Sequence, residues 1–272
     1  KKDTTDRNRT SPFAFTGNKF EFRMLGSAVN IACPNLMLNT IVAEELSEFA
    51  DELEKAKDFD KAVMKLIKKT IKAHKRIIFN GNNYSDEWVE EAKKRGLLNL
   101  RTMPEAMPYY ISDKNVKLFT KNKIFTETEI HSRYEIQLEN YSKILNIEAL
   151  TMLDMAKKDI LPAVTSYVRD LTDTALSKKA LSPDLPCDFE EDLIAKLSGL
   201  TSCFAKKITA LEQVLLKTKD IEGVQEIANF YGEEVFPAMQ ELRAVGDEME
   251  INTGAEYWPY PTYGELLFGV ND

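Results

Sequence analysis

Hydrophobic and charged residues alternate strictly in one short stretch near the start of the chain. Over residues 19–23, the charged positions are Lys19, Glu21 and Arg23, and the aromatic positions are Phe20 and Phe22. Alternation with a period of two and aromatic apolar positions is typical of a β-strand. We therefore predict a strand whose apolar face packs on a core and whose other face carries a carboxylate between two cations.

A second short strand is predicted just upstream, at residues 13–15, which read Phe-Ala-Phe. Residues 16–18, Thr-Gly-Asn, separate the two stretches. Gly and Asn tolerate positive φ, so this cluster predicts a turn. We expect a short β-hairpin with Arg9 near its open end.

From Pro34 onward the apolar residues recur every three to four positions, which predicts amphipathic helices. Residues with capping chemistry mark several helix starts, at Asp58, Ser85, Thr102 and Thr126. The expected helices cover residues 36–53, 59–76, stretches beginning near 86, 103 and 113, and then 126–177, 188–218 and 221–249. The last three are long and joined by short connections. The sequence thus predicts a mainly α fold, a helical bundle with long antiparallel helices, preceded by the short β-hairpin.

Two prolines fall inside the long helical patterns. Pro162 and Pro237 each remove one backbone hydrogen bond, so we expect a kink at the first and a bend at the second. Residues 182–186, Ser-Pro-Asp-Leu-Pro, predict the linker between two of the long helices.

Beyond Glu250 the chain changes to aromatic residues interleaved with prolines, which gives a stiff amphipathic tail. The favoured interpretation is that this tail docks on the chain's own helices or on a neighbouring subunit. The alternative is a free peptide motif that another protein recognises.

Composition restricts the possible functions. The chain has 272 residues, is 43% hydrophobic and carries a net charge of −8, which argues against a nucleic-acid surface. The lysine-rich side of the helix expected at 59–76 is better explained as a solvated face near the preceding acidic helix than as an RNA-binding face. No apolar run is long enough to span a membrane, so we expect no membrane partner. Three widely spaced cysteines favour reduced thiols in a cytoplasmic protein.

The residues alone give one candidate for chemistry, the charged face of the predicted strand. A carboxylate such as Glu21 can ligate a hard metal ion, and flanking cations can hold phosphate or carboxylate groups of a substrate. The simpler interpretation is the solvated outer face of an ordinary sheet. GxGxxG, P-loop, GxSxG and HExxH motifs are absent from the sequence, and His74 and His131 are better explained as packing or surface residues.

These stretches also carry a family resemblance. Residues 9–12 (Arg-Thr-Ser-Pro) and 19–23 (Lys-Phe-Glu-Phe-Arg) resemble the catalytic domain of type III glutamine synthetases. The resemblance continues through residues 26–35, the Pro- and Glu-containing helix start at 102–105, and the aromatic segment at 258–268. It covers essentially the whole chain.

The resemblance implies an ATP-dependent glutamate–ammonia ligase that works through γ-glutamyl phosphate, with Mg²⁺ or Mn²⁺ and ATP as cofactors. By motif, Glu21 matches a metal-binding glutamate and Arg23 the catalytic arginine that faces the glutamate and the transferred phosphoryl group. Arg9 matches a catalytic arginine near the ATP phosphates, and Lys19 takes a nucleotide-side position. Ala14 falls near a place where other classes carry an arginine. Glutamate, ammonia and ATP are the implied substrates, and a ring-shaped homo-oligomer is the implied assembly.

The resemblance also implies a division of the chain. We expect residues 1–35 to be the end of the catalytic β-sheet domain, 36–125 a short-helix region of that domain, 126–250 the long-helix bundle, and 251–272 the docking tail. The other metal carboxylates of the family would lie outside this stretch. We therefore expect the chain to be the C-terminal piece of a larger enzyme, to bind no metal or ATP on its own, and to be inactive alone. The alternative is a helical scaffold or oligomerisation module without catalysis.

Overall fold

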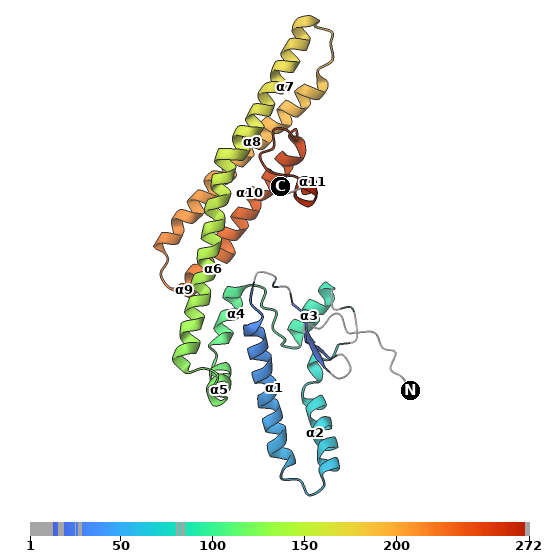
Figure 1. Cartoon of the computed structure of the whole chain (residues 1–272), viewed down its shortest axis with the longest axis vertical. Helices are drawn as coiled ribbons and strands as arrows, with labels where there is room; N and C mark the ends of the chain where they lie inside the picture. Colours follow the sequence, from blue (N-terminus) through green and yellow to red (C-terminus); the bar gives the residue numbers. More distant parts are fainter. Residues whose placement is uncertain are drawn as a thin grey trace, which may run out of the picture. The chain divides into compact units, whose positions relative to one another are not determined.

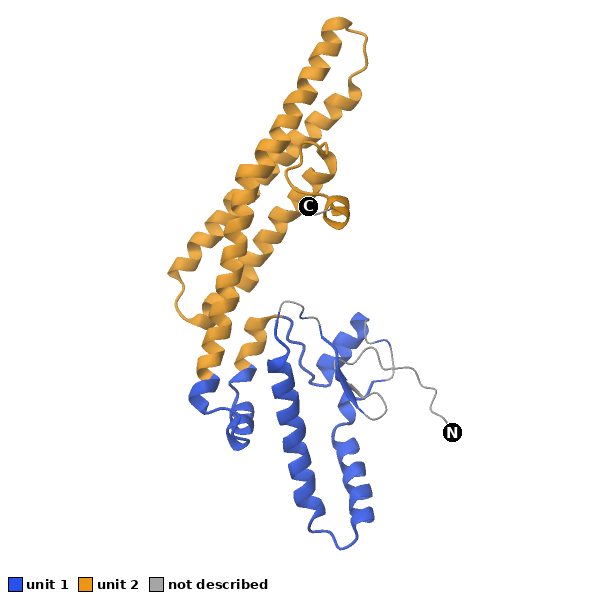
Figure 2. Cartoon of the chain, viewed as in Figure 1, with its two compact units in different colours: residues 1–101, 109–130 blue, residues 102–108, 131–272 orange. Residues whose placement is uncertain are grey.

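The computed structural model describes residues 13–15, 19–24, 26, 29–79, 82 and 85–269. Over these residues the chain is mainly helical, with long helices packed together (Figure 1). It divides into two compact units (Figure 2). Unit 1 comprises residues 1–101 and 109–130, and unit 2 comprises residues 102–108 and 131–272.

Two short strands of unit 1 pair antiparallel, β1 (Phe13–Phe15) with β2 (Phe20–Phe22). Phe13 lies opposite Phe22, and Ala14 lies opposite Glu21. Both strands were predicted from the sequence, and both predictions are confirmed. The turn predicted at residues 16–18 lies outside the described residues.

The aromatic face of this ribbon differs from the prediction. Phe20 is 56% exposed, and its ring stacks on Phe13 with the centroids 4.7 Å apart. Two stacked rings shield each other but leave their outer faces in water. The expectation that Phe20 packs on a core is therefore wrong for the described part of the chain.

Unit 1 continues as helices joined by short connections. They are α1 (Ala32–Leu53), α2 (Phe59–Ala73), the 3₁₀ turn η1 (Lys75–Ile77), α3 (Asp86–Lys94) and α5 (Asp113–Lys121). The carboxylate of Glu44 on α1 pairs with Lys121 of α5 and accepts a 2.9 Å hydrogen bond from Asn122. These bonds lower the pKa of Glu44, with the Lys121 contact as the largest cause. The ring of Phe119 is buried between Tyr110 and Phe125.

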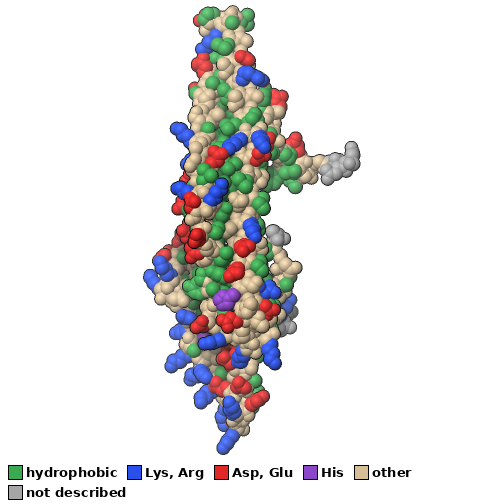
Figure 3. All heavy atoms as spheres, turned by 90° about the vertical axis from the view of Figure 1, so that its left-hand side faces the viewer, with side chains coloured by type: hydrophobic (Ala, Val, Ile, Leu, Met, Phe, Trp, Pro, Cys, Tyr) green, Lys and Arg blue, Asp and Glu red, His purple; other side chains and the backbone are tan. Residues whose placement is uncertain are grey.

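The lysines of α2 are exposed to solvent, and Lys69 forms a 2.7 Å ion pair with Glu52 of the acidic helix α1. Lys and Arg side chains also gather at the end of unit 1 that holds the turn between α1 and α2 (Figure 3). A solvated basic face beside the acidic helix agrees with the sequence-based interpretation.

The predicted helix starts are correct in position, but only some of them have the side-chain capping hydrogen bond that was expected. Asp58 accepts a 3.1 Å hydrogen bond from the backbone N–H of Lys61, as an N-cap should. Ser85 and Ser112 stand at N-cap positions without a side-chain cap bond, because each hydroxyl instead donates to a carbonyl three residues earlier. Thr102 and Glu105 form both bonds of a capping box.

Unit 2 is built from longer helices. Helix α4 (Met103–Tyr110) begins in this unit, and α6 (Glu127–Met155) lies mostly within it. The others are the π-helical turn η2 (Ala156–Ile160), α7 (Leu161–Leu181), α8 (Asp188–Lys217), η3 (Thr218–Asp220), α9 (Val224–Phe230), the π-helical turn η4 (Tyr231–Val235), α10 (Phe236–Asn252) and α11 (Tyr263–Phe268). Helix α8 packs against both α7 and α10. The predicted linker at residues 182–186 connects α7 to α8.

Both prolines predicted to disturb the helices follow a π-helical turn. Pro162 is the second residue of α7 after η2, and Pro237 is the second residue of α10 after η4. In each case the residue before proline donates its N–H to the carbonyl five positions earlier: Leu161 to Ala156, and Phe236 to Tyr231. Proline has no N–H of its own, so a widened turn lets the helix pass it without ending.

The core of unit 2 lies where α6, α7, α8 and α10 meet, around the fully buried side chains of Leu197, Phe204, Leu211 and Leu242. The C-terminal tail covers part of it. Tyr257 donates a 2.6 Å hydrogen bond to Asp170 of α7, and its ring lies 4.9 Å from that of Tyr167. Trp258 packs against the core, so this part of the tail docks on the chain's own helices. Helix α11 differs, because its Tyr263 and Phe268 are each 83% exposed.

Candidate functional site

The charged face of β2 places two of the predicted site residues side by side. Glu21 lies in the strand and Arg23 follows its last residue, so the two side chains, two positions apart, share one face. Lys19 precedes the strand and is exposed. Arg9 lies outside the described residues.

Glu21 and Arg23 form a close ion pair. Arg23 donates from Nη2 to Oε2 of Glu21 at 2.6 Å, and from Nε to the same oxygen at 3.2 Å. Each side chain is 26% exposed. A pair this close to solvent stabilises the fold by only about 0–1 kcal/mol. Its main consequence is positional, since it fixes the guanidinium plane on the strand's charged face.

The ribbon of β1 and β2 carries one carboxylate that could ligate a metal ion. Divalent ions such as Mg²⁺ take several oxygen ligands, usually one or two carboxylates with substrate phosphates and water. Glu21 supplies one carboxylate, and within the described residues no group of three or more His, Cys, Asp or Glu side chains could hold a metal ion. The donor type fits a hard metal, while the other ligands would come from substrate and from other parts of the protein.

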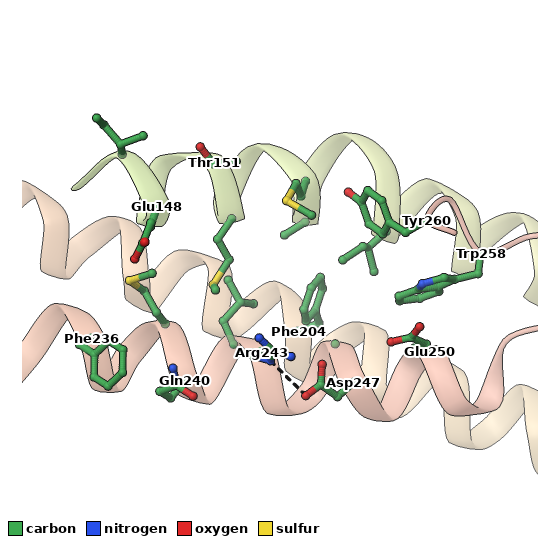
Figure 4. A pocket seen from close by; sticks show the side chains of 18 residues that line it. Glu148, Thr151, Phe204, Phe236, Gln240, Arg243, Asp247, Glu250, Trp258 and Tyr260 are labelled. Carbon is green, nitrogen blue, oxygen red and sulfur yellow. Dashed lines mark hydrogen bonds and ion pairs between the residues drawn. The ribbon is translucent and has the colours of Figure 1, made fainter. Parts of the chain in front are cut away.

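A second surface feature, which the sequence did not predict, lies in unit 2. Helices α6 and α10 flank an open cavity of about 650 Å³, with the ring of Phe204 from α8 at its floor and Trp258 and Tyr260 at one end (Figure 4). We call this the α6–α10 groove. Glu148 and Thr151 line its α6 wall, and Figure 4 shows the Glu148 side chain pointing toward α10.

The α10 wall of the groove carries both apolar and charged residues. Its lining residues recur at three- to four-residue intervals: Phe236, Met239, Gln240, Leu242, Arg243, Gly246, Asp247 and Glu250. This periodicity was visible in the sequence, but it mixes polar and apolar positions and so did not mark a binding face. Arg243 pairs with Asp247 at 3.4 Å between Nε and Oδ2.

Tyr260 closes the end of the groove. Its hydroxyl donates a 2.9 Å hydrogen bond to Oδ2 of Asp159 in η2. Burial, followed by this hydrogen bond to a carboxylate, raises the pKa of Tyr260 to about 12. The phenol therefore stays protonated at physiological pH and acts as a fixed donor.

Comparison with known proteins shows that the chain is similar to glutamine synthetases. Residues 62–179 match the model of the glutamine synthetase C-terminal domain. The chain is 45% identical to a glutamine synthetase of Butyrivibrio fibrisolvens over 286 aligned residues, which cover 99% of the chain. It is 38% identical to the type-3 glutamine synthetase of Dictyostelium discoideum and 35% identical to a glutamine synthetase of Bacteroides fragilis (strain YCH46), each over 98% of the chain.

The chain is homologous to the C-terminal portion of glutamine synthetases. The resemblance inferred from residues 9–12 and 19–23 is thereby confirmed. The chain spans 39%, 37% and 38% of the lengths of these three relatives. Among its described residues, no helix is both long enough and apolar enough to cross a lipid bilayer.

Proposed function

We propose that the ribbon of β1 and β2 forms one wall of the active site of a glutamine synthetase, an enzyme that joins ammonia to glutamate at the expense of ATP. The observation that supports this proposal is the Glu21–Arg23 pair, fixed on one strand face of a chain homologous to glutamine synthetases. Phosphoryl transfer depends mainly on positioning and on stabilisation of charge. A carboxylate that can bind a metal ion and a guanidinium that can stabilise phosphate charge, held side by side, suit this reaction.

In the proposed reaction, a γ-carboxylate oxygen of glutamate attacks the γ-phosphorus of ATP, and the bond to the β-phosphate oxygen breaks to release ADP. Ammonia then attacks the γ-carbonyl carbon of the acyl phosphate, loses a proton, and displaces phosphate to give glutamine. Arg23 would face the glutamate and stabilise the negative charge that develops on the transferred phosphoryl group. Arg9 and Lys19 would hold the ATP phosphates.

Glu21 would be one ligand of the Mg²⁺ or Mn²⁺ that the family implies. When bound, such an ion neutralises phosphate charge and orients the nucleotide. The role of Glu21 is to present a carboxylate at the strand face, and Arg23 holds that carboxylate in place through Oε2. Because a single carboxylate is too few for a divalent ion, we expect the 272-residue chain by itself to form no glutamine.

A second candidate, a helical scaffold without catalysis, is favoured by the exposed apolar side chains of unit 2, such as those of α11. The two proposals separate in one experiment. Glu21→Gln and Arg23→Gln are made in a longer protein that includes this chain and is as long as its relatives. ATP-dependent glutamine formation is then measured. The matched control is Glu54→Gln, an exposed acid at the end of α1.

We expect each ribbon variant to lose about 10²-fold or more in kcat, as for removal of one charge-stabilising group, while Glu54→Gln retains full activity. Normal turnover of both ribbon variants would contradict the active-site proposal and favour the helical scaffold without catalysis. Unchanged helicity by circular dichroism shows that a loss of activity does not come from unfolding.

A further inference from the structure

We propose that the α6–α10 groove is a docking site for a basic amphipathic helix of a partner protein. The groove lies entirely in unit 2 and shares no residue with the ribbon, so this inference is independent of the proposed catalytic role. It depends on the shape, the exposed apolar rim and the charge of the groove.

The shape fits a helix. Along α10 the groove runs from Phe236 to Glu250, which at 1.5 Å per residue corresponds to about 21 Å. That length takes about four turns of a second helix. Figure 4 shows α6 and α10 facing each other across the cavity, with α8 behind them. An added helix would lie between the two walls and cover Phe236, which is 44% exposed.

The rim supplies the apolar contacts, because Ile147 and Phe236 are 62% and 44% exposed. Phe204, Met239 and Leu242 form the buried part of the lining. Helix-in-groove recognition uses this arrangement, in which side chains at i, i+3, i+4 and i+7 of the incoming helix enter an apolar channel. Covering Ile147 and Phe236 would remove exposed apolar surface from water.

The charge of the groove selects the partner. Glu148, Asp247 and Glu250 line it against a single cation, Arg243, which is already engaged with Asp247. A helix with lysine or arginine beside its apolar stripe would complement this excess of negative charge. The chain's own exposed helix α11 is a poor candidate, since it carries Glu265 and no basic residue.

The test uses the full 272-residue chain and two synthetic helical peptides of about 15 residues. Both carry the same leucine stripe, flanked by lysine in one peptide and by glutamate in the other. Binding is measured by fluorescence anisotropy of labelled peptide. Emission of Trp258, isolated in a Trp88→Phe background because the chain has two tryptophans, reports occupancy at the groove.

One variant addresses the groove, and one is its control. Glu148→Lys with Glu250→Lys reverses the charge of both walls. The control, Glu135→Lys with Glu256→Lys, makes the same charge change at exposed positions outside the groove.

We expect the lysine-flanked peptide to bind at least about tenfold more tightly than the glutamate-flanked one, and to lose a similar factor in the charge-reversed variant but not in the control. Equal binding of the two peptides, or no binding, would overturn the proposal. So would self-association of the chain that the charge reversal removes, because a second copy would then be the occupant.

Discussion

Tyr260 of the C-terminal tail donates a 2.9 Å hydrogen bond from its hydroxyl to Oδ2 of Asp159, joining the tail to the π-helical turn η2. Together with the Tyr257–Asp170 bond, it fastens residues 257–260 to the helices beneath. This attachment depends on a protonated phenol, so it gives the tail a pH dependence at the alkaline end.

The first prediction concerns that dependence. Burial and Asp159 raise the pKa of Tyr260 to about 12, above the value of about 10 in an unfolded chain. A raised pKa favours the protonated form in the folded state, so the stabilisation is fully present below about pH 10 and is lost as the pH rises through about 12. Absorbance at the tyrosinate band should show one late-titrating phenol fewer in Tyr260→Phe than in the unmodified chain.

The control for this titration is Tyr263→Phe, whose ring is 83% exposed and should leave the late step in place. An unchanged number of late-titrating phenols in Tyr260→Phe would contradict the raised pKa of Tyr260.

A second prediction compares two residues at N-cap positions within unit 1. Asp58→Ala removes the hydrogen bond that caps α2 and should lower the free energy of unfolding by more than Ser85→Ala does. Ser85→Ala should change it by no more than about 0.5 kcal/mol, because the Ser85 hydroxyl donates to Asn82 and caps nothing. Urea unfolding followed by circular dichroism gives both values. Equal losses would mean that Ser85 caps α3 after all.

A third prediction tests the packing beneath the groove. A Cβ added at Gly246 would lie 3.3 Å from Cε2 of Phe204, a ring that is 1% exposed. We expect Gly246→Ala to destabilise the protein by about 1 kcal/mol, since overpacking exceeds the gain in helix propensity. In a Phe204→Leu background the overlap is relieved, and the same substitution should become stabilising.

Gly199 of α8 is the control for this cycle, because an added Cβ there meets no atom within 4 Å. Gly199→Ala should stabilise the protein by up to about 1 kcal/mol in either background. Additive effects of Gly246→Ala and Phe204→Leu would contradict the packing account.

Local signals predicted the helices well. Asp58, Thr102 and Thr126 mark true helix starts because capping chemistry acts within four residues of sequence. The prolines were correctly singled out as irregular positions, and the structure has a π-helical turn before each of them. The widened turn accommodates the missing N–H without ending the helix.

Features that depend on the surroundings were harder to predict. The alternation at residues 19–23 predicted β2 and the common face of Glu21 and Arg23, but it did not reveal that Phe20 would be exposed. Alternation defines two faces without saying what covers them. The groove was missed for a related reason, since Glu148 and Asp247 lie about a hundred residues apart and only the fold brings their helices together. The roles of Arg9, Lys19, Glu21 and Arg23 remain predictions.

The most direct test of the central claim is the formation of the acyl phosphate itself. A longer protein that includes this chain and is as long as its relatives is mixed with glutamate and γ-labelled ATP, without ammonia. Transfer of the label to glutamate is followed in a single turnover. We predict that Arg23→Gln slows this step by about 10²-fold or more, and that Arg23→Lys restores part of the rate by keeping the charge. An unchanged rate in Arg23→Gln would contradict the assignment of the ribbon to the phosphoryl-transfer site.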